Sequence, residues 1–115
     1  MNFTDLIAWQ KAHQLVLEIY KATAKFPKEE LYGLVSQMRR CSVSVPANVA
    51  EGFRRLSKKE KLRFYNISQG SLEELKYYII LSNDLNYLKA AELDDSIEEV
   101  SRLLNSLVKS TLHTE

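Results

Sequence analysis

The sequence predicts an all-α protein: an antiparallel four-helix bundle with up-down-up-down topology that self-associates. The chain has 115 residues, enough for one domain and too few for a second core, so residues 1–115 are expected to form a single bundle domain. Three glycines and two prolines are too few for the turns of a β-sandwich or a βαβ series. Apolar residues recur every three or four positions in four stretches, and the short connections between them make neighbouring helices antiparallel.

The first helix is expected over residues 5–26. Apolar side chains follow a helical spacing along it at Leu6, Trp9, Val16 and Tyr20. Thr4 or Asp5 is a suitable cap for its start, because the short polar side chains accept from free backbone N–H groups. Pro27 ends it, because the residue before a proline avoids helical dihedrals.

The second helix is expected over residues 30–55, with a kink at Pro46. Its apolar stripe continues through the proline, at Leu34, Met38, Cys41, Val45, Val49 and Phe53. A proline inside a helix removes one backbone donor and presses on the carbonyl four residues earlier, so the helix is expected to bend there. Polar groups on Ser42, Ser44 and Asn48 are close enough to satisfy freed backbone groups, which favours a kinked core helix with local polar repair.

The third and fourth helices are expected over residues 58–87 and 90–112. Ser57 and Glu60 have the spacing of a capping box, S-K-K-E, at the start of the third helix. The pattern resets around Asn86, and a heptad-like apolar stripe then begins at Leu93. These four segments account for almost the whole chain.

Two small-residue positions predict close packing inside the helices. Gly52 costs about 1 kcal/mol relative to alanine in a helix, so a close neighbour is expected there. Gly70 and Ser71 form a second such position in the middle of the third helix. We expect each to receive a bulky neighbour, either Trp9 or a tyrosine.

Surplus apolar residues on the first and third helices predict self-association. Both helices carry apolar residues around more than half of their circumference, including Tyr65, Tyr77, Tyr78, Ile80 and Tyr87. A small bundle needs one apolar stripe per helix, and surplus apolar surface usually marks a partner surface. The alternative is a bundle with an unusually wide core.

The residues that usually carry catalysis or bind metals are sparse, which predicts a protein that is not an enzyme and has no catalytic residue, metal site or cofactor. The only histidines are His13, on an apolar stripe and so expected in the core, and His113 near the C-terminus. Cys41 is the single cysteine, and no cluster has zinc-ligand spacing. Glu51 is expected to pair along its helix with an arginine three or four residues later.

The chain is also expected to be cytoplasmic, with no membrane partner. A lone cysteine suits a reducing compartment. The N-terminal residues lack the basic and continuous apolar regions of a signal peptide, and no apolar run is long enough to span a bilayer.

A net charge of +1 hides a strong asymmetry. The stretch RRLSKKEKLR, residues 54–63, holds six cations and one glutamate, whereas AAELDDSIEEV, residues 90–100, holds five acids and no base. We expect the nucleic-acid-binding cations to share one edge, at or near the end of the second helix and the start of the third: Arg39, Arg40, Arg54, Arg55, Lys58, Lys59, Lys61 and Arg63. In an oligomer this edge becomes a belt that neutralises phosphates of RNA or DNA in a salt-dependent and largely sequence-independent way.

Other interpretations of the charges remain open. The cations are also consistent with a solvated surface around a helix junction. A protein-interaction scaffold without direct nucleic-acid binding is a further alternative, with the basic edge docking on an acidic partner or on the acidic stretch of an adjacent subunit.

Four motifs resemble the 23S rRNA-intervening sequence protein family. They are F-x-D-L-x-x-W-x-K-A over residues 3–12, F-P-x-E-x-x-G-L-x-x-Q-x-R-R over residues 26–40 in a form one residue longer, S-V-P-A-N-V-A-E-G over residues 44–52, and G-S-L-E-E-L over residues 70–75. The motif residues singled out are Ser44, Pro46, Asn48, Glu51, Gly52, Gly70 and Ser71. The chain is also similar to the accessory variability determinant of diversity-generating retroelements. The resemblance implies a four-helix bundle assembled as a pentamer, a basic surface for nucleic acid and, for the retroelement relative, a reverse transcriptase as partner.

Overall fold

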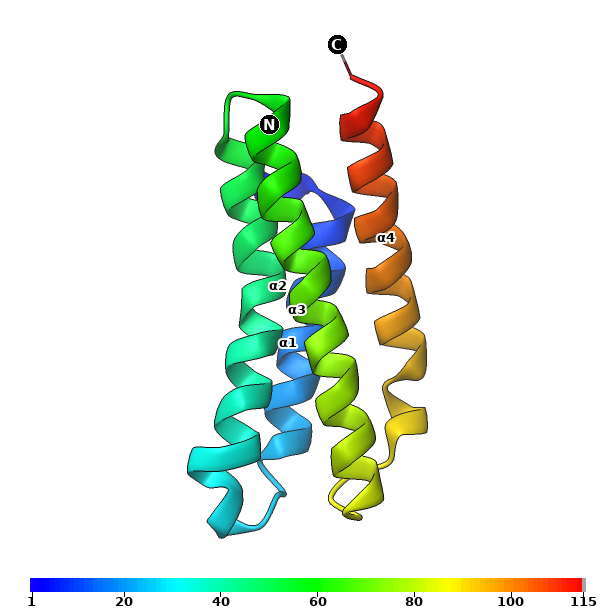
Figure 1. Cartoon of the computed structure of the whole chain (residues 1–115). Helices are drawn as coiled ribbons and strands as arrows, with labels where there is room; N and C mark the ends of the chain where they lie inside the picture. The colour runs from blue at the N-terminus through cyan, green and yellow to red at the C-terminus, as the bar shows by residue number, and fades with distance from the viewer. Residues whose placement is uncertain (115) are drawn as a thin grey trace.

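The computed structural model describes residues 1–114 and is all-α, as the sequence predicts. Its long helices are α1 (Ile7–Thr23), α2 (Ser36–Arg54), α3 (Lys58–Asp84) and α4 (Asp94–Leu112). Figure 1 shows consecutive helices running in opposite directions, so the two termini and the α2–α3 turn lie at the same end of the molecule. The bundle is elongated, with extents of 48 × 24 × 21 Å.

The core runs along the middle of the bundle. Helix α1 packs against α2 and α4, and α3 packs against the same two helices from the other side. All four helices contribute fully buried side chains, among them Leu15, Ile19, Met38, Val45, Leu72, Leu75, Val100 and Leu104. Removal of this apolar surface from water is the main stabilising term. None of the helices in residues 1–114 is both long and apolar enough to cross a lipid bilayer.

Helix α1 is shorter at both ends than the predicted span. Leu6 has extended backbone dihedrals, φ −73° and ψ 126°, and separates α1 from a short 3-10 turn, η1 (Phe3–Asp5). Asn2 caps that turn, and the Asp5 carboxylate accepts from the Asn2 N–H at 2.9 Å. The prediction that Thr4 or Asp5 caps the long helix is therefore wrong, because both residues belong to a separate capped turn.

The region before α2 contains two irregular turns. A 3-10 turn, η2 (Lys28–Glu30), leads directly into a π-helical turn, η3 (Leu31–Val35), in which Gly33 leaves helical dihedrals. The Glu30 carboxylate accepts from the Leu34 N–H at 3.3 Å. Regular α-helix begins only at Ser36 and then continues through Pro46.

Helix α3 begins at the predicted residue, Lys58, whereas its C-terminal end and the start of α4 differ from the predicted spans. The Ser57 hydroxyl accepts from the Glu60 N–H at 3.1 Å, but the Glu60 carboxylate turns away to Arg63, so only half of the capping box forms. Helix α3 ends at Asp84, and Asn86 adopts a φ of 63°, in the left-handed region that breaks a helix. A 3-10 turn, η4 (Ala90–Glu92), then precedes α4.

Candidate nucleic-acid interface

Helices α2 and α3 meet along a polar contact that we call the α2–α3 seam, formed by Cys41, Ser44, Ser68 and Ser71. The Cys41 thiol donates to the Ser71 carbonyl at 2.9 Å, and the Ser44 and Ser71 hydroxyls are 2.8 Å apart. The Ser68 hydroxyl donates to the Val45 carbonyl. These short side chains hold two helix backbones together while satisfying their own polar groups, as buried polar atoms require.

The polar side chains of Ser42 and Asn48, on either side of Pro46, form hydrogen bonds within α2. The Asn48 amide donates to the Ser44 carbonyl at 2.8 Å and to the Ser44 hydroxyl oxygen at 2.9 Å. The Ser42 hydroxyl donates to the Arg39 carbonyl at 3.0 Å. None of these three bonds goes to the carbonyl of Ser42, the group that loses its helical donor at Pro46.

The two small-residue positions have opposite surroundings. A Cβ atom on Gly52 would lie 2.6 Å from Cε1 of Tyr65 and 3.2 Å from Cβ of Phe64, so the expectation of a tyrosine neighbour is confirmed there. Gly70 is exposed, and, apart from its two chain neighbours and the backbone of its own helical turn, no atom of residues 1–114 lies within 4 Å of the place where its Cβ would be. At Gly70 the expectation of a bulky neighbour is wrong within one chain.

Six of the eight predicted cations gather at the α2–α3 turn, where the two termini also lie (Figure 1). We call this group the basic end, formed by Arg54, Arg55, Lys58, Lys59, Lys61 and Arg63. These six side chains have three distinct roles, with two side chains in each: ion pairing on a helix surface, capping of helix ends, and exposure without a partner.

Arg39 and Arg40 do not belong to the basic end, so the prediction that all eight cations share one edge is wrong. They lie in the first turns of α2, and a rise of 1.5 Å per residue puts Arg40 about 21 Å from Arg54 along the helix. The guanidinium of Arg39 donates to the Thr23 hydroxyl at 3.0 Å and lies 4.5 Å from the ring centroid of Tyr20. Arg39 thus fixes α2 to the end of α1.

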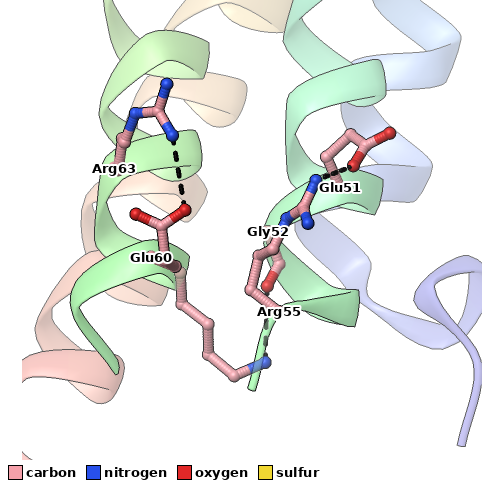
Figure 2. Close-up of polar contacts among 6 residues, drawn as sticks. Glu51, Gly52, Arg55, Glu60 and Arg63 are labelled. Atoms are coloured by element: carbon pink, nitrogen blue, oxygen red, sulfur yellow. Dashed lines mark hydrogen bonds and ion pairs between the residues drawn. The ribbon is translucent and has the colours of Figure 1, made fainter. Parts of the chain in front are cut away.

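Two arginines of the basic end form ion pairs on their own helices, as Figure 2 shows. Arg55 binds the carboxylate of Glu51 at 2.8 Å, which is the partner predicted for Glu51, and Arg63 binds Glu60 at 3.3 Å. Both guanidinium groups also approach the ring of Phe64, at 4.6 and 5.3 Å from its centroid. Exposed pairs of this kind are weak, so these arginines exchange partners at low cost.

Two lysines of the basic end cap helix C-termini. The ammonium of Lys61 donates to the carbonyls of Gly52 at 3.3 Å and Phe53 at 2.7 Å, in the last turn of α2. The ammonium of Lys58 donates to the Leu112 carbonyl at 3.0 Å, at the end of α4. A cation at a helix C-terminus satisfies free carbonyls and complements the helix dipole, a role that the charge pattern did not reveal.

The remaining two cations, Arg54 and Lys59, are exposed. Within residues 1–114 neither side chain has an ion-pair or hydrogen-bond partner. They are therefore the members of the basic end whose charge is not used by the fold.

The acidic stretch is partly used inside the chain. The carboxylate of Glu99 lies 3.7 Å from the Lys11 ammonium. Asp94 and Asp95 occupy the first turn of α4, where negative charge is favoured by the helix dipole.

Side chains with catalytic potential stay apart. His13 is exposed and stacks on Trp9 with ring centroids 5.1 Å apart, so its predicted place in the core is wrong. Burial, with a smaller contribution from the charge of Glu74, raises the pKa of the Cys41 thiol to about 12. No group of three or more metal-ligating residues occurs within residues 1–114.

The surplus apolar residues of α3 divide into two groups. Tyr65 is buried, and the Tyr78 hydroxyl donates to Glu74 at 2.8 Å. Tyr77 and Ile80 are each 57% exposed and lie with Gly70 on the side of α3 that faces away from the core. That outward face is not covered by any part of residues 1–114.

Comparison with known proteins shows which family and which solved structures the chain is similar to. The model of one family, described as 23S rRNA-intervening sequence protein, matches residues 4–108. Among solved structures, the chain is similar to a protein of unknown function from the S23 ribosomal protein family of Bacteroides thetaiotaomicron, with a TM-score of 0.79 and 20% identity over 90% of this chain and 99% of that one. At that identity the likeness shows the fold. No match is found among the curated proteins.

Proposed function

The chain belongs to the 23S rRNA-intervening sequence protein family, and we propose that it is a non-enzymatic homo-oligomer that presents its basic end to RNA or DNA. The observation that carries this proposal is the gathering of six cations at one end of the bundle, with Arg54 and Lys59 exposed and unpartnered. Phosphate groups would supply the missing partners and release condensed counterions.

The division of roles at the basic end suits binding without sequence preference. Arg54 and Lys59 contact phosphates directly, while Arg55 and Arg63 contribute by leaving weak surface pairs with Glu51 and Glu60. Contacts to phosphate fix position and carry no base identity. Such binding steers encounter with any polyanion and weakens steeply with salt.

The outward face of α3 supports self-association. Gly70 costs about 1 kcal/mol relative to alanine and gains no close contact within the chain, which suits close approach of another helix. Tyr77 and Ile80 extend this face with apolar surface. In line with the family resemblance, we take a pentamer as the assembly and a reverse transcriptase or another RNA-linked protein as a partner, so that each ring carries several basic ends.

A salt series of fluorescence-anisotropy titrations tests the charge assignment. The double variant Arg54→Gln with Lys59→Gln is compared with wild type on a labelled structured RNA and a duplex DNA. Because each lost phosphate contact lowers the slope of log K against log salt by about 0.9, the double variant is expected to lose about two units of slope per bound protomer. Sedimentation velocity checks that its assembly is unchanged.

The matched control is Lys21→Gln with Lys25→Gln, which removes the same charge near the opposite end of the bundle. This variant is expected to bind like wild type. Equal binding by the Arg54 and Lys59 variant would overturn the charge assignment. If wild type binds neither probe at low salt, the protein-interaction scaffold becomes the better explanation, and a partner protein for the basic end is then sought by affinity capture.

A further inference from the structure

A hollow of about 290 Å³ opens beside the basic end, between the last turns of α2 and α4 and the first turns of α3. Its walls include apolar side chains of Phe53, Leu56 and Leu107. Leu56 is 95% exposed in the α2–α3 turn, which is unusual for a leucine set among cations. Sites for drug-sized ligands run from about 300 to 1,000 Å³, so a hollow of about 290 Å³ has room for a group smaller than most such ligands.

Tyr65 gives the hollow a polar group that the fold does not use. Its ring packs against Gly52, only 2% of the residue is exposed, and it lines the hollow. Within residues 1–114 its hydroxyl has no hydrogen-bond partner, whereas every fully enclosed polar side-chain atom in that part of the chain has one. The hydroxyl therefore keeps an opening through which a ligand atom can bind it.

The state of this hydroxyl indicates what kind of atom it binds. A tyrosine hydroxyl with its ordinary pKa is neutral at physiological pH and both donates and accepts, and burial raises the pKa of Tyr65 further. A neutral donor and acceptor beside apolar walls matches the edge of a heterocyclic base. An acyl chain would leave the hydroxyl unsatisfied, which costs free energy in a buried site.

Cations surround the opening on the side of the turn. Lys58 and Lys61 line the hollow while holding the carbonyl ends of α4 and α2. Lys59 directly follows Lys58, Arg54 directly follows Phe53 of the wall, and both cations are exposed. A ligand with a flat, weakly polar ring and an adjoining negative charge complements this arrangement.

We infer that the hollow takes an unpaired base of a single-stranded RNA or DNA, whose phosphates run along Arg54 and Lys59. The inference rests on the proposed function and names its substrate class, because only an unpaired base can leave the strand and enter the hollow. Contact of unpaired bases with aromatic and apolar side chains strengthens single-strand complexes whatever their sequence. The protein therefore binds single strands more tightly than duplexes of the same sequence.

The test compares four labelled probes at one salt concentration. They are a single-stranded RNA, the DNA strand of the same sequence, the matching duplex DNA, and a DNA strand of equal length in which the central nucleotides are abasic. Wild type is expected to bind the base-bearing DNA strand about tenfold more tightly than the abasic strand. A 2-aminopurine placed in the centre of the strand reports entry of a base through a change in its fluorescence.

Tyr65→Phe tests the hydroxyl without removing the ring from Gly52. Affinity for the base-bearing strand is expected to fall about three- to tenfold, the usual value of one hydrogen bond, with no change for the abasic strand. Tyr78→Phe is the matched control, because its hydroxyl binds Glu74 on α3 outside the basic end, and it is expected to bind like wild type.

The outcomes separate this inference from the proposed function. Equal binding of abasic and base-bearing strands, tighter binding of the duplex, or an unaltered Tyr65→Phe variant would overturn the base site while leaving phosphate binding intact. Absence of binding to all four probes would overturn both. Tighter binding of the base-bearing strand than of the abasic strand, lost in Tyr65→Phe and kept in Tyr78→Phe, would support the base site.

Discussion

The α2–α3 seam and the basic end involve the same two helices, yet they use polar groups in opposite ways. In the seam, Cys41, Ser44 and Ser71 bond to one another or to backbone across a short distance. At the basic end, six long cationic side chains surround a turn, and Arg54 and Lys59 have no partner within residues 1–114. The polar groups of the seam have partners within one chain, whereas two cations of the basic end have none within residues 1–114.

This difference shows which polar groups of the protein have partners within the fold and which remain available for binding. Buried polar atoms that lack partners destabilise a fold, so the seam tolerates no surplus. Exposed cations remain hydrated and cost little when unpaired, so a charge surplus is compatible with stability at the surface. We therefore expect changes in the seam to alter stability and changes at the unpartnered cations to alter binding.

The largest expected effect concerns the Cys41 thiol. Because its pKa is raised from 9.0 to about 12, the reactive thiolate at pH 8 is about a thousandfold scarcer than in the unfolded chain. The rate of reaction with a disulfide reagent at pH 8, measured with and without urea, checks this. A native rate within tenfold of the denatured one would show that the seam opens readily.

The same thiol makes stability depend on pH in the alkaline range. Below pH 9 both the folded and the unfolded thiol are protonated, and Cys41 has its full stabilising effect. Between pH 9 and about 12 the unfolded chain loses this proton first, so the free energy of unfolding falls as pH rises, by up to about 1.4 kcal/mol per pH unit. Urea melts of Cys41→Ala are expected to show a shallower fall over this window than wild type.

The next largest expected effect is a difference in stability between alanine variants of the two glycines, Gly52 and Gly70. Gly52→Ala brings a methyl group to 2.6 Å from the ring of Tyr65, and we expect it to lower the free energy of unfolding by about 1–3 kcal/mol. Gly70→Ala is the matched control, because its methyl group meets open space, and we expect it to raise the stability of one bundle by up to about 1 kcal/mol. Thermal and urea melts measure both.

A loss of stability in Gly52→Ala together with a gain in Gly70→Ala would support the distinction between the two positions. Equal destabilisation by both would contradict it and would mean that Gly70 is needed in the folded chain itself. If Gly70→Ala stabilises the bundle but weakens the oligomer in sedimentation, the outward face of α3 is the subunit contact.

The smallest expected effect is a difference in stability between variants of two nearby lysines, Lys61 and Lys59. Lys61→Met removes the cap from the last carbonyls of α2, and we expect a loss of about 1 kcal/mol in the free energy of unfolding. Lys59→Met removes an unpartnered cation and is expected to leave stability unchanged while weakening nucleic-acid binding. Urea melts beside anisotropy titrations measure the two, and a reversed pattern would show that the roles of capping and binding lysines had been assigned the wrong way round.

Most of the fold could be predicted from local sequence. The apolar spacing at Val16, Met38 and Val45 marked the sides of helices that are buried in the structure. Helix ends were less predictable, because the extended backbone at Leu6 and the left-handed Asn86 depend on how the connections pack.

The candidate site could be predicted only in outline. The run from Arg54 to Arg63 indicated a basic surface, since a turn between two helices brings its neighbours together. Arg39 was wrongly grouped with it, although the helix predicted over residues 30–55 already separates Arg39 from Arg54 by about four turns. The unused hydroxyl of Tyr65 had no signal in the sequence, because its spacing along α3 is that of an ordinary core residue.

The sequence by itself determined the four helices, the sign of the charge at the α2–α3 turn and membership in the family, because periodicity, charge and motif are properties of neighbouring positions. The tertiary structure alone decided which cations are used by the fold, that Gly52 receives Tyr65, and that Gly70 faces open space. Those outcomes depend on distances between atoms far apart in the chain. Such distances are set by packing of the whole bundle, which no local pattern specifies.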